Sequence, residues 1–194
     1  MYRATMESEA RMGESSRRFD PDRKSRIIDA CLAVIAERGV AGASHRVIAA
    51  AADVPLGSMT YHFDGLHDLL HQAFDRYAQQ CIDRFHERMA QARDVDEACE
   101  QIARHVEGDL LATRHDLIVN LELYTLAARD PAYRDISNRW MAASRRELER
   151  FFDPPTAAML DALIEGLTLH RALGGDSLDP KNIRESIRRT AHMP

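Results

Sequence analysis

Residues 44–63 read SHRVIAAAADVPLGSMTYHF, a stretch whose two halves differ in character. The first half is alanine-rich and begins with Ser44, a residue type that caps helix N-termini, so we expect a short helix through Ala52. Asp53 begins a turn. A second short helix is predicted over residues 55–61, because proline is well tolerated in the first turn of a helix. The stretch therefore predicts two short helices joined by a tight turn.

The flanking sequence supplies longer helices on both sides of this pair. Residues 21–38 carry apolar side chains at helical spacing and end before Gly39, a typical helix stop. A long amphipathic helix is predicted from Leu66 into the high eighties. A longer helix that braces two short ones is the arrangement of a helix-turn-helix, whose second helix enters the major groove of DNA. The spacing alone also allows a short core helix in an unrelated helical bundle.

The second short helix has side chains that suit contact with DNA. Small or short side chains let a helix lie deep in the groove, and a glycine lets the DNA backbone approach closely. A phenol and an imidazole at the helix end can both donate to phosphate oxygens. The candidate groove-facing residues are Leu56, Gly57, Ser58 and Thr60, and the candidate phosphate contacts are Tyr61 and His62.

Residues 26–74 resemble the DNA-binding domain of the tetracycline-repressor (TetR) family of bacterial regulators. The resemblance covers AERG at the end of the first helix, then S-x-R-x-IA, then V-x-x-G-S-x-x-Y-H-F. It implies phosphate contacts for Ser44, and a phosphate or base-edge contact for Arg46. Three residues depart from the family pattern. Asp53 replaces a turn glycine, so it must accept a left-handed conformation or strain the turn. Thr60 replaces a frequent tyrosine, and Leu66 replaces a lysine that often reaches phosphate.

The composition predicts a cytoplasmic protein with no membrane segment. The chain has 194 residues, of which 45% are hydrophobic and 29% charged, and the net charge is −5. No uncharged apolar run approaches the roughly 20 residues that a membrane span needs. Residues 1–63 have a net charge of +1, so the acidic excess lies in the remainder. DNA binding requires local positive charge rather than a basic protein as a whole.

The whole chain is predicted to be all-α, because no convincing period-2 strand occurs in it. We expect a flexible tail at 1–20, a helix-turn-helix domain at 21–65 and a domain for ligand binding and dimerisation at 66–194. Arginines 11, 17 and 18 of the tail could reach a minor groove or lie in mere disorder, and Met6 or Met12 could be the true start. Proline and glycine mark most helix breaks in the second domain. Its helices are predicted at 95–112, 114–129, 132–152, 156–173 and 180–191.

The segment TAAMLDALIEGLTLHRAL, residues 156–173, is too apolar for a helix with one face in water. It resembles, with the last helix, the two-helix element through which TetR-family proteins form a four-helix dimer interface. The alternative is that its leucines complete the core of the monomer. The candidate interface residues are Leu160, Leu163, Ile164 and Leu167.

Residues 114–152 combine large apolar side chains with a few polar ones, which is how small-molecule sites are built. They predict a pocket for an unknown small-molecule effector, although the same residues could serve only to pack the core. The candidate lining residues are Leu117, Leu121, Tyr124, Trp140, Met141 and Ser144. The face of the long helix around Tyr77, Cys81 and Phe85 is the next candidate.

These patterns predict a homodimeric transcriptional regulator that binds a double-stranded DNA operator, most simply a repressor released by its effector. An activator, an all-α enzyme and a helical adaptor are the alternatives. His67 and His71 are four residues apart and could share a metal ion, but solvated or packed histidines are the simpler interpretation. The acidic residues Glu100, Glu107, Glu122 and Glu165 lie in different predicted helices, so we expect neither catalysis nor a cofactor.

Overall fold

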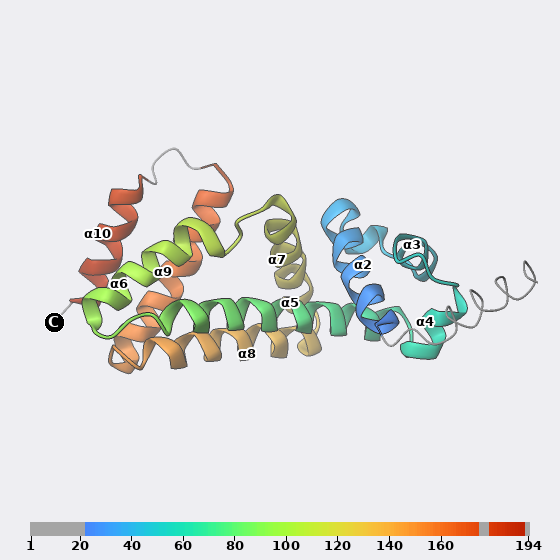
Figure 1. Ribbon diagram of the computed structural model, residues 1–194, viewed down its shortest axis with the longest axis horizontal. Coiled ribbons are helices and arrows are strands. Elements are labelled where there is room, and N and C mark those ends of the chain that lie inside the picture. The colour runs from blue at the N-terminus through green and yellow to red at the C-terminus, as the bar shows by residue number, and fades with distance from the viewer. Residues whose placement is uncertain (1–21, 175–178, 193–194) are drawn as a thin grey trace, which may run out of the picture.

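The computed structural model describes residues 22–174 and 179–192, and every regular element in these ranges is a helix (Figure 1). The tail expected at residues 1–20, with its three arginines and alternative start sites, lies outside the described residues. The first helices are α2 (Arg23–Arg38), η1 (Val40–Gly42), α3 (His45–Ala51), α4 (Gly57–His62) and α5 (Leu66–Met89). The remaining helices are α6 (Val95–Arg104), η2 (His105–Asp109), α7 (Arg114–Ala127), α8 (Pro131–Leu148), α9 (Pro154–Ala172) and α10 (Pro180–Ala191).

Short polar side chains begin most of these helices. In each case an oxygen of the capping side chain accepts a hydrogen bond from a backbone N–H of the first turn, which would otherwise have no partner. Helices α8, α9 and α10 also have proline in the first turn. The capping residues of this kind are Ser44, Asp94, Thr113, Asp130, Asp153 and Asp179.

Helices α5 and α8 run side by side along the length of the molecule (Figure 1). Helices α2, α3 and α4 lie at one end of this pair, and α6, α9 and α10 lie at the other. Helix α7 lies between the two ends and packs against both α2 and α8. The 24-residue helix α5 thus joins the short helices of the N-terminal part to the rest of the chain.

Two hydrophobic clusters hold the arrangement together. The first joins α2, α3 and α4 to α5, α7 and α8, with Met59, Phe74 and Tyr133 among its most buried side chains. The second lies at the other end, where α5, α6, α8, α9 and α10 meet around Met89 and Leu160. No helix of the described residues is both long and apolar enough to cross a membrane.

The helix expected over 95–112 is the one whose course differs most from the prediction. Helix α6 ends at Arg104 and is followed by the π-helical turn η2, in which the N–H of Leu110 donates to the carbonyl of His105 at 3.2 Å. Leu111 then has a φ of 48°. Long-range contacts stabilise this irregular segment, since Arg88 binds both carboxylate oxygens of Asp109 at 2.7 Å. Periodicity along one helix does not reveal such contacts.

Candidate functional site

The turn between α3 and α4 follows the geometry of a helix-turn-helix. Ser44 caps α3 by accepting a hydrogen bond from the N–H of Val47 at 3.3 Å. After α3, the N–H of Val54 donates to the carbonyl of Ala49 at 3.0 Å, which closes the turn. Asp53 has a φ of 50°, so it adopts the left-handed conformation that glycine usually supplies. The expected replacement of a turn glycine by Asp53 is therefore accommodated in that conformation.

Helix α4 begins at Gly57 rather than at Pro55. Residues 55 and 56 form a tight turn instead, because the N–H groups of Ser58 and Met59 donate to carbonyls three residues earlier. Met59 is completely buried and Phe63 nearly so, and these two side chains anchor the helix to the core. The opposite face is open, with Leu56 56% exposed and Tyr61 83% exposed. Large apolar and aromatic side chains exposed on a short helix favour a contact surface.

Most of the candidate DNA-binding side chains, on α3 and α4, are at least partly exposed. Arg46 and Thr60 are exposed, and Ser44 and His62 are half-buried. A Cβ added to Gly57 would meet no atom within 4 Å, so the surface there is open to a partner. Ser58 is the exception, since it is only 8% exposed and does not face outward. It is buried on the inward side of the helix beside Met59, so the prediction that it faces the groove is wrong.

Basic residues at the start of α2 lie near the end of α4. Burial, followed by the positive charges of Arg23 and Lys24, lowers the pKa of His62. The Lys24 ammonium also lies 5.6 Å from the centre of the Phe63 ring. The ring of His62 meets that of Tyr61 edge-on, with centroids 4.8 Å apart. Arg23 and Lys24 thus add positive charge beside the candidate phosphate contacts. In the sequence, only the predicted packing of the first helix against the short helices could indicate that these two residues lie there.

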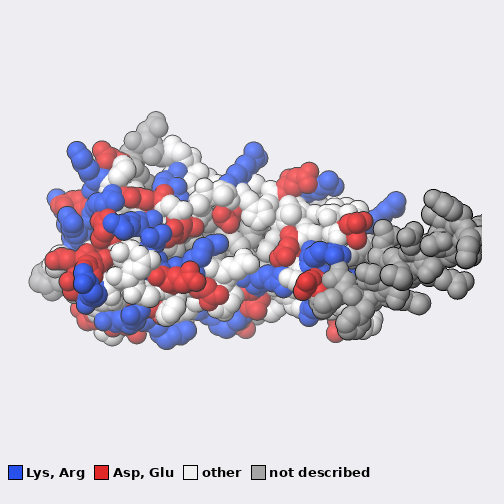
Figure 2. Space-filling model, in the orientation of Figure 1, with Lys and Arg blue, Asp and Glu red and all other residues white. Residues whose placement is uncertain are grey.

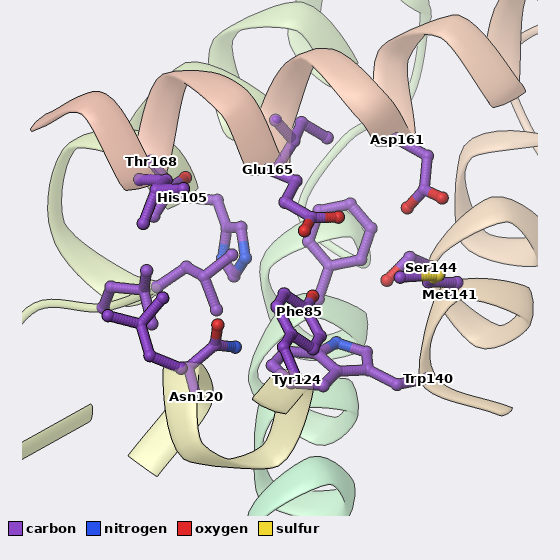
Figure 3. A pocket seen from close by; sticks show the side chains of 15 residues that line it. Phe85, His105, Asn120, Tyr124, Trp140, Met141, Ser144, Asp161, Glu165 and Thr168 are labelled. Atoms are coloured by element: carbon purple, nitrogen blue, oxygen red, sulfur yellow. The ribbon is translucent and has the colours of Figure 1, made fainter. Parts of the chain in front are cut away.

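A cavity lies between α5, α7, α8 and α9 (Figure 3), and its empty space is about 660 Å³ when the open solvent at its mouth is included. Leu117 does not line the cavity, because it lies one turn before the α7 residues that do. Phe85 of α5 also contributes, whereas Tyr77 and Cys81 of the same helix are buried in the core. The residues of the predicted pocket that line the cavity are Leu121, Tyr124, Trp140, Met141 and Ser144.

Three polar groups of the cavity come from α9, a helix that the sequence did not predict to line it. Asp161, Glu165 and Thr168 of α9 face the cavity, as do His105 of η2 and Asn120 of α7 (Figure 3). Their side chains converge only because α9 packs across α7 and α8, and no local pattern indicates that approach.

Burial dominates the electrostatics of the cavity. It raises the pKa of Asp161 to about 6, although Arg145 lies 3.2 Å from that carboxylate and opposes the shift. Burial also lowers the pKa of His105, because the effect of burial is larger than the opposing effect of the nearby Asp109 carboxylate. For Tyr124, burial followed by the charge of Glu165 raises the pKa. A neutral imidazole and a neutral phenol are therefore the stable forms of these rings at neutral pH.

The candidate interface residues of α9 lie largely in the core of the monomer. Leu160, Ile164 and Leu167 belong to the second hydrophobic cluster, and Ile164 also lines the cavity. Leu163 is half-buried against the same cluster. The prediction that Leu160, Ile164 and Leu167 face a partner is therefore wrong, because these side chains pack in the core of the monomer, where α9 contacts α8, α10 and η2. The outward face of α9 instead exposes Ala158, Met159, Ala162 and Gly166.

Four of the residues that could suggest an enzyme or a metal site have structural partners. His67 contacts the carboxylate of Asp130 at 3.0 Å, and His71 packs against the ring of Tyr133. Glu100 and Glu107 both bind Arg184. Among the described residues, no group of three or more His, Cys, Asp or Glu side chains could hold a metal ion. On the face shown in Figure 2, acidic and basic side chains intermingle over the end formed by α6, α9 and α10.

The fold and the exposed short helix are those of a DNA-binding transcriptional regulator. Two family models match the chain: residues 27–73 match "Bacterial regulatory proteins, tetR family", and residues 93–192 match "Tetracyclin repressor-like, C-terminal domain". The second match alone covers just over half of the chain. This protein therefore belongs to the TetR family of bacterial regulators, a family of transcriptional regulators rather than enzymes.

Solved structures and a curated relative agree with this assignment. The structure of the transcriptional regulator SCO7518 from Streptomyces coelicolor A3(2) is 49% identical, covers 89% of this chain and 100% of that one, and has a TM-score of 0.83. The multidrug binding protein EbrR in complex with ethidium is 34% identical, covers 88% and 99% of the two chains, and has a TM-score of 0.72. The transcriptional regulator CymR of Pseudomonas putida is 29% identical over 65% of this chain and 61% of its own length.

Proposed function

We propose that this regulator is a homodimeric repressor that leaves its operator when a small molecule enters the cavity. The position of α7 carries the proposal. Asn120, Leu121 and Tyr124 of this helix line the cavity, whereas Val119 and Leu123 pack in the cluster that contains α2. A ligand that displaces α7 would therefore displace the helix that braces α3 and α4. This path supports a coupling between the cavity and the DNA-binding helices.

The exposed face of α4 is proposed to enter the major groove of the operator. Leu56 and Thr60 would meet base edges, and Gly57 would allow close approach of the DNA backbone. Ser44, Arg46, Tyr61 and His62 are proposed to contact phosphates, with Arg46 also able to reach a base edge. Two copies of α4 would bind successive major grooves, about 34–36 Å apart, as in other helix-turn-helix dimers.

The outward face of α9, together with α10, is proposed to form the dimer interface. Ala158, Ala162 and Gly166 recur every four residues on this face, and Met159 is partly exposed beside them. Small side chains let two helices approach closely, and a four-helix contact of this kind would bury the face in a symmetric dimer. Leu163 would lie at the border between this interface and the core.

These assignments give each part of the chain its own function. We assign DNA binding to residues 21–65, and effector binding and dimerisation to residues 66–194. The operator would be chromosomal DNA, so the protein is expected in the cytoplasm. The complexes of EbrR with ethidium, malachite green and proflavin support a small-molecule effector for this chain as well.

A gel-shift assay tests the DNA-binding part of the proposal. DNA from upstream of the protein's own gene is titrated with the full chain in the presence of excess random DNA, and sedimentation gives the mass of the complex. We expect a dimer on a palindromic site, protected at two half-sites in a footprint. Equal affinity for the upstream and random DNA would contradict a role as a specific repressor.

A further inference from the structure

Two carboxylates face the cavity from consecutive turns of α9. Asp161 and Glu165 are four residues apart, so they lie on the same side of the helix, and both line the cavity (Figure 3). Arg145 of α8 contacts Asp161 at 3.2 Å. No lysine, arginine or histidine among the described residues forms an ion pair with Glu165. Among the described residues, the two carboxylates therefore have one basic partner between them, Arg145.

The remaining titratable groups of the cavity do not balance this charge. Burial lowers the pKa of His105, so its imidazole is neutral at neutral pH. The side chain of Arg145 is 39% exposed, whereas that of Asp161 is 17% exposed, so the arginine lies toward solvent from the acid. An excess of negative charge in a partly closed site favours a positively charged occupant, because the occupant would replace water around the carboxylates.

Aromatic rings form the wall beside these carboxylates. Figure 3 shows Phe85, Tyr124 and Trp140 grouped near Glu165 in the middle of the cavity. The face of an aromatic ring attracts a cation, and the attraction grows when water is excluded. Rings and carboxylates together are therefore suited to a flat organic cation rather than to a hydrated metal ion.

The end of the cavity away from Asp161 has neutral polar groups. Thr168 is completely buried, and its hydroxyl oxygen has no hydrogen-bond partner. Figure 3 shows Thr168, His105 and Asn120 together on this side, with Asp161, Ser144 and Met141 on the opposite side. A buried hydroxyl without a partner is costly, so it points to a ligand atom that completes its hydrogen bonds.

From this arrangement we propose that the effector is an organic cation with an aromatic or apolar body. Its positive charge lies against Glu165 and Asp161, its body stacks between Phe85, Tyr124 and Trp140, and a neutral polar group reaches Thr168. This assignment rests on the proposed function, since it names the class of molecule that the effector cavity accepts.

Two dyes that share a ring system test the charge preference. Proflavin is a cation at neutral pH, and acridine is neutral under mildly alkaline conditions that keep proflavin charged. Each dye is titrated into the full chain without DNA, because proflavin itself binds DNA, and binding is followed by the emission of Trp140, the sole tryptophan. The variants are Glu165→Gln and Asp161→Asn, which keep size and polarity. Glu149→Gln is the matched control, because Glu149 is exposed and does not line the cavity.

We expect the wild type to bind proflavin more tightly than acridine. Glu165→Gln should weaken proflavin binding by about tenfold or more, with acridine binding changed by less than about threefold. Asp161→Asn should act in the same direction, and Glu149→Gln should leave both affinities unchanged. A thermal melt of each variant verifies that the fold is intact.

A gel shift on the same preparations separates this inference from the proposed function. Equal losses for both dyes, or unchanged proflavin binding in both carboxylate variants, would overturn the selection of a cation. Failure of both dyes to alter Trp140 emission, with operator binding intact, would overturn the cation assignment and leave the DNA-binding role standing. Carboxylate-dependent proflavin binding without any operator binding would instead support the site and refute the repressor.

Discussion

Glu122 of α7 lies against Gly39 at the end of α2, so closely that a Cβ at residue 39 would sit 2.6 Å from the Oε1 atom of the glutamate. Gly39 has a φ of 69°, which residues with a side chain rarely adopt. The helix that lines the cavity therefore meets the DNA-binding helices with no side chain of residue 39 between them. This close approach links the cavity to the DNA-binding part of the protein.

Gly39→Ala should lower the free energy of unfolding by about 1–3 kcal/mol, because the positive φ becomes strained. The contact with Glu122 adds little, since the carboxylate is the flexible end of its side chain and can move. Urea denaturation of the two proteins measures the difference.

Gly57→Ala is the matched control for this substitution. A Cβ at residue 57 meets no atom within 4 Å, so the free protein should keep its stability or gain slightly. The double variant Gly39→Ala/Glu122→Ala should recover only a minor part of the loss. Full recovery in the double variant would show that the contact, and not the backbone conformation, limits residue 39.

Tyr61→Phe should weaken DNA binding by about 0.5–1.5 kcal/mol, the value of one hydrogen bond to a phosphate. The loss should be the same for operator and random DNA, because a phosphate contact carries no sequence information. Tyr61 is 83% exposed, so the stability of the free protein should not change. Gel shifts on both DNAs and a thermal melt test these expectations.

Thr60→Ala should instead change the preferred operator sequence. The hydroxyl of Thr60 donates to the carbonyl of Gly57 at 3.2 Å in the free protein, and the residue as a whole is exposed. A side chain at a base edge affects some base pairs more than others. Selection of binding sites from a random DNA pool measures the change, and identical preferences for wild type and variant would contradict a base contact.

Ala162→Glu should dissociate the dimer without unfolding the monomer. Ala162 is exposed on the outward face of α9, so a glutamate there is solvated in the monomer but desolvated in the proposed interface. Leu167→Glu should unfold the monomer instead, since Leu167 is buried in the second hydrophobic cluster. Sedimentation and circular dichroism distinguish the two results. A dimeric, folded Ala162→Glu variant would move the interface away from this face.

Asp161→Asn should stabilise the protein at neutral pH. Burial raises the pKa of Asp161 from 3.8 to about 6, so the folded state binds a proton more tightly than the unfolded state does. Stability contributed by this proton is present below the unfolded pKa and is lost as the pH rises from about 4 to 6. Asparagine does not ionise, so the variant does not lose this stability as the pH rises. Its free energy of unfolding should therefore exceed that of the wild type by about 1–3 kcal/mol above pH 6.

Two charged neighbours of Asp161 also affect the stability of the asparagine variant. Arg145 lies against the carboxylate from α8, and Glu165 adds negative charge from the same helix. Arg145 is partly exposed and can be hydrated when its partner is gone. Melting temperatures measured across the pH range test the prediction, and a variant equally less stable at every pH would indicate that the contact with Arg145 dominates.

The helix-turn-helix could be predicted because its signals are local. Ser44, Asp53 and the apolar residues around Met59 specify a cap, a turn and an inward face within twenty residues. The burial of Ser58 could not be predicted, because spacing along α4 does not show which other elements cover a short side chain next to the buried Met59.

The α9 contacts could not be predicted from periodicity alone. A helix that is apolar on most sides can face its own core, a partner or a cavity, and its sequence does not distinguish these surroundings. The pattern therefore assigns Leu160, Ile164 and Leu167 to the wrong neighbour, and it does not indicate that Asp161 and Glu165 line the cavity. The residues of α7 and α8 were found because consecutive helices pack against each other more often than distant ones.

The length of α5 has a mechanical consequence. At about 1.5 Å per residue, the 24 residues from Leu66 to Met89 form a rod about 36 Å long, with Phe85 at the cavity and Leu66 beside α4. These two residues are about 28 Å apart along the rod. If α5 tilted by about 5° around Phe85, Leu66 would therefore move by about 2.5 Å. A displacement of this size at α4 would change how the helix fits into a rigid DNA groove.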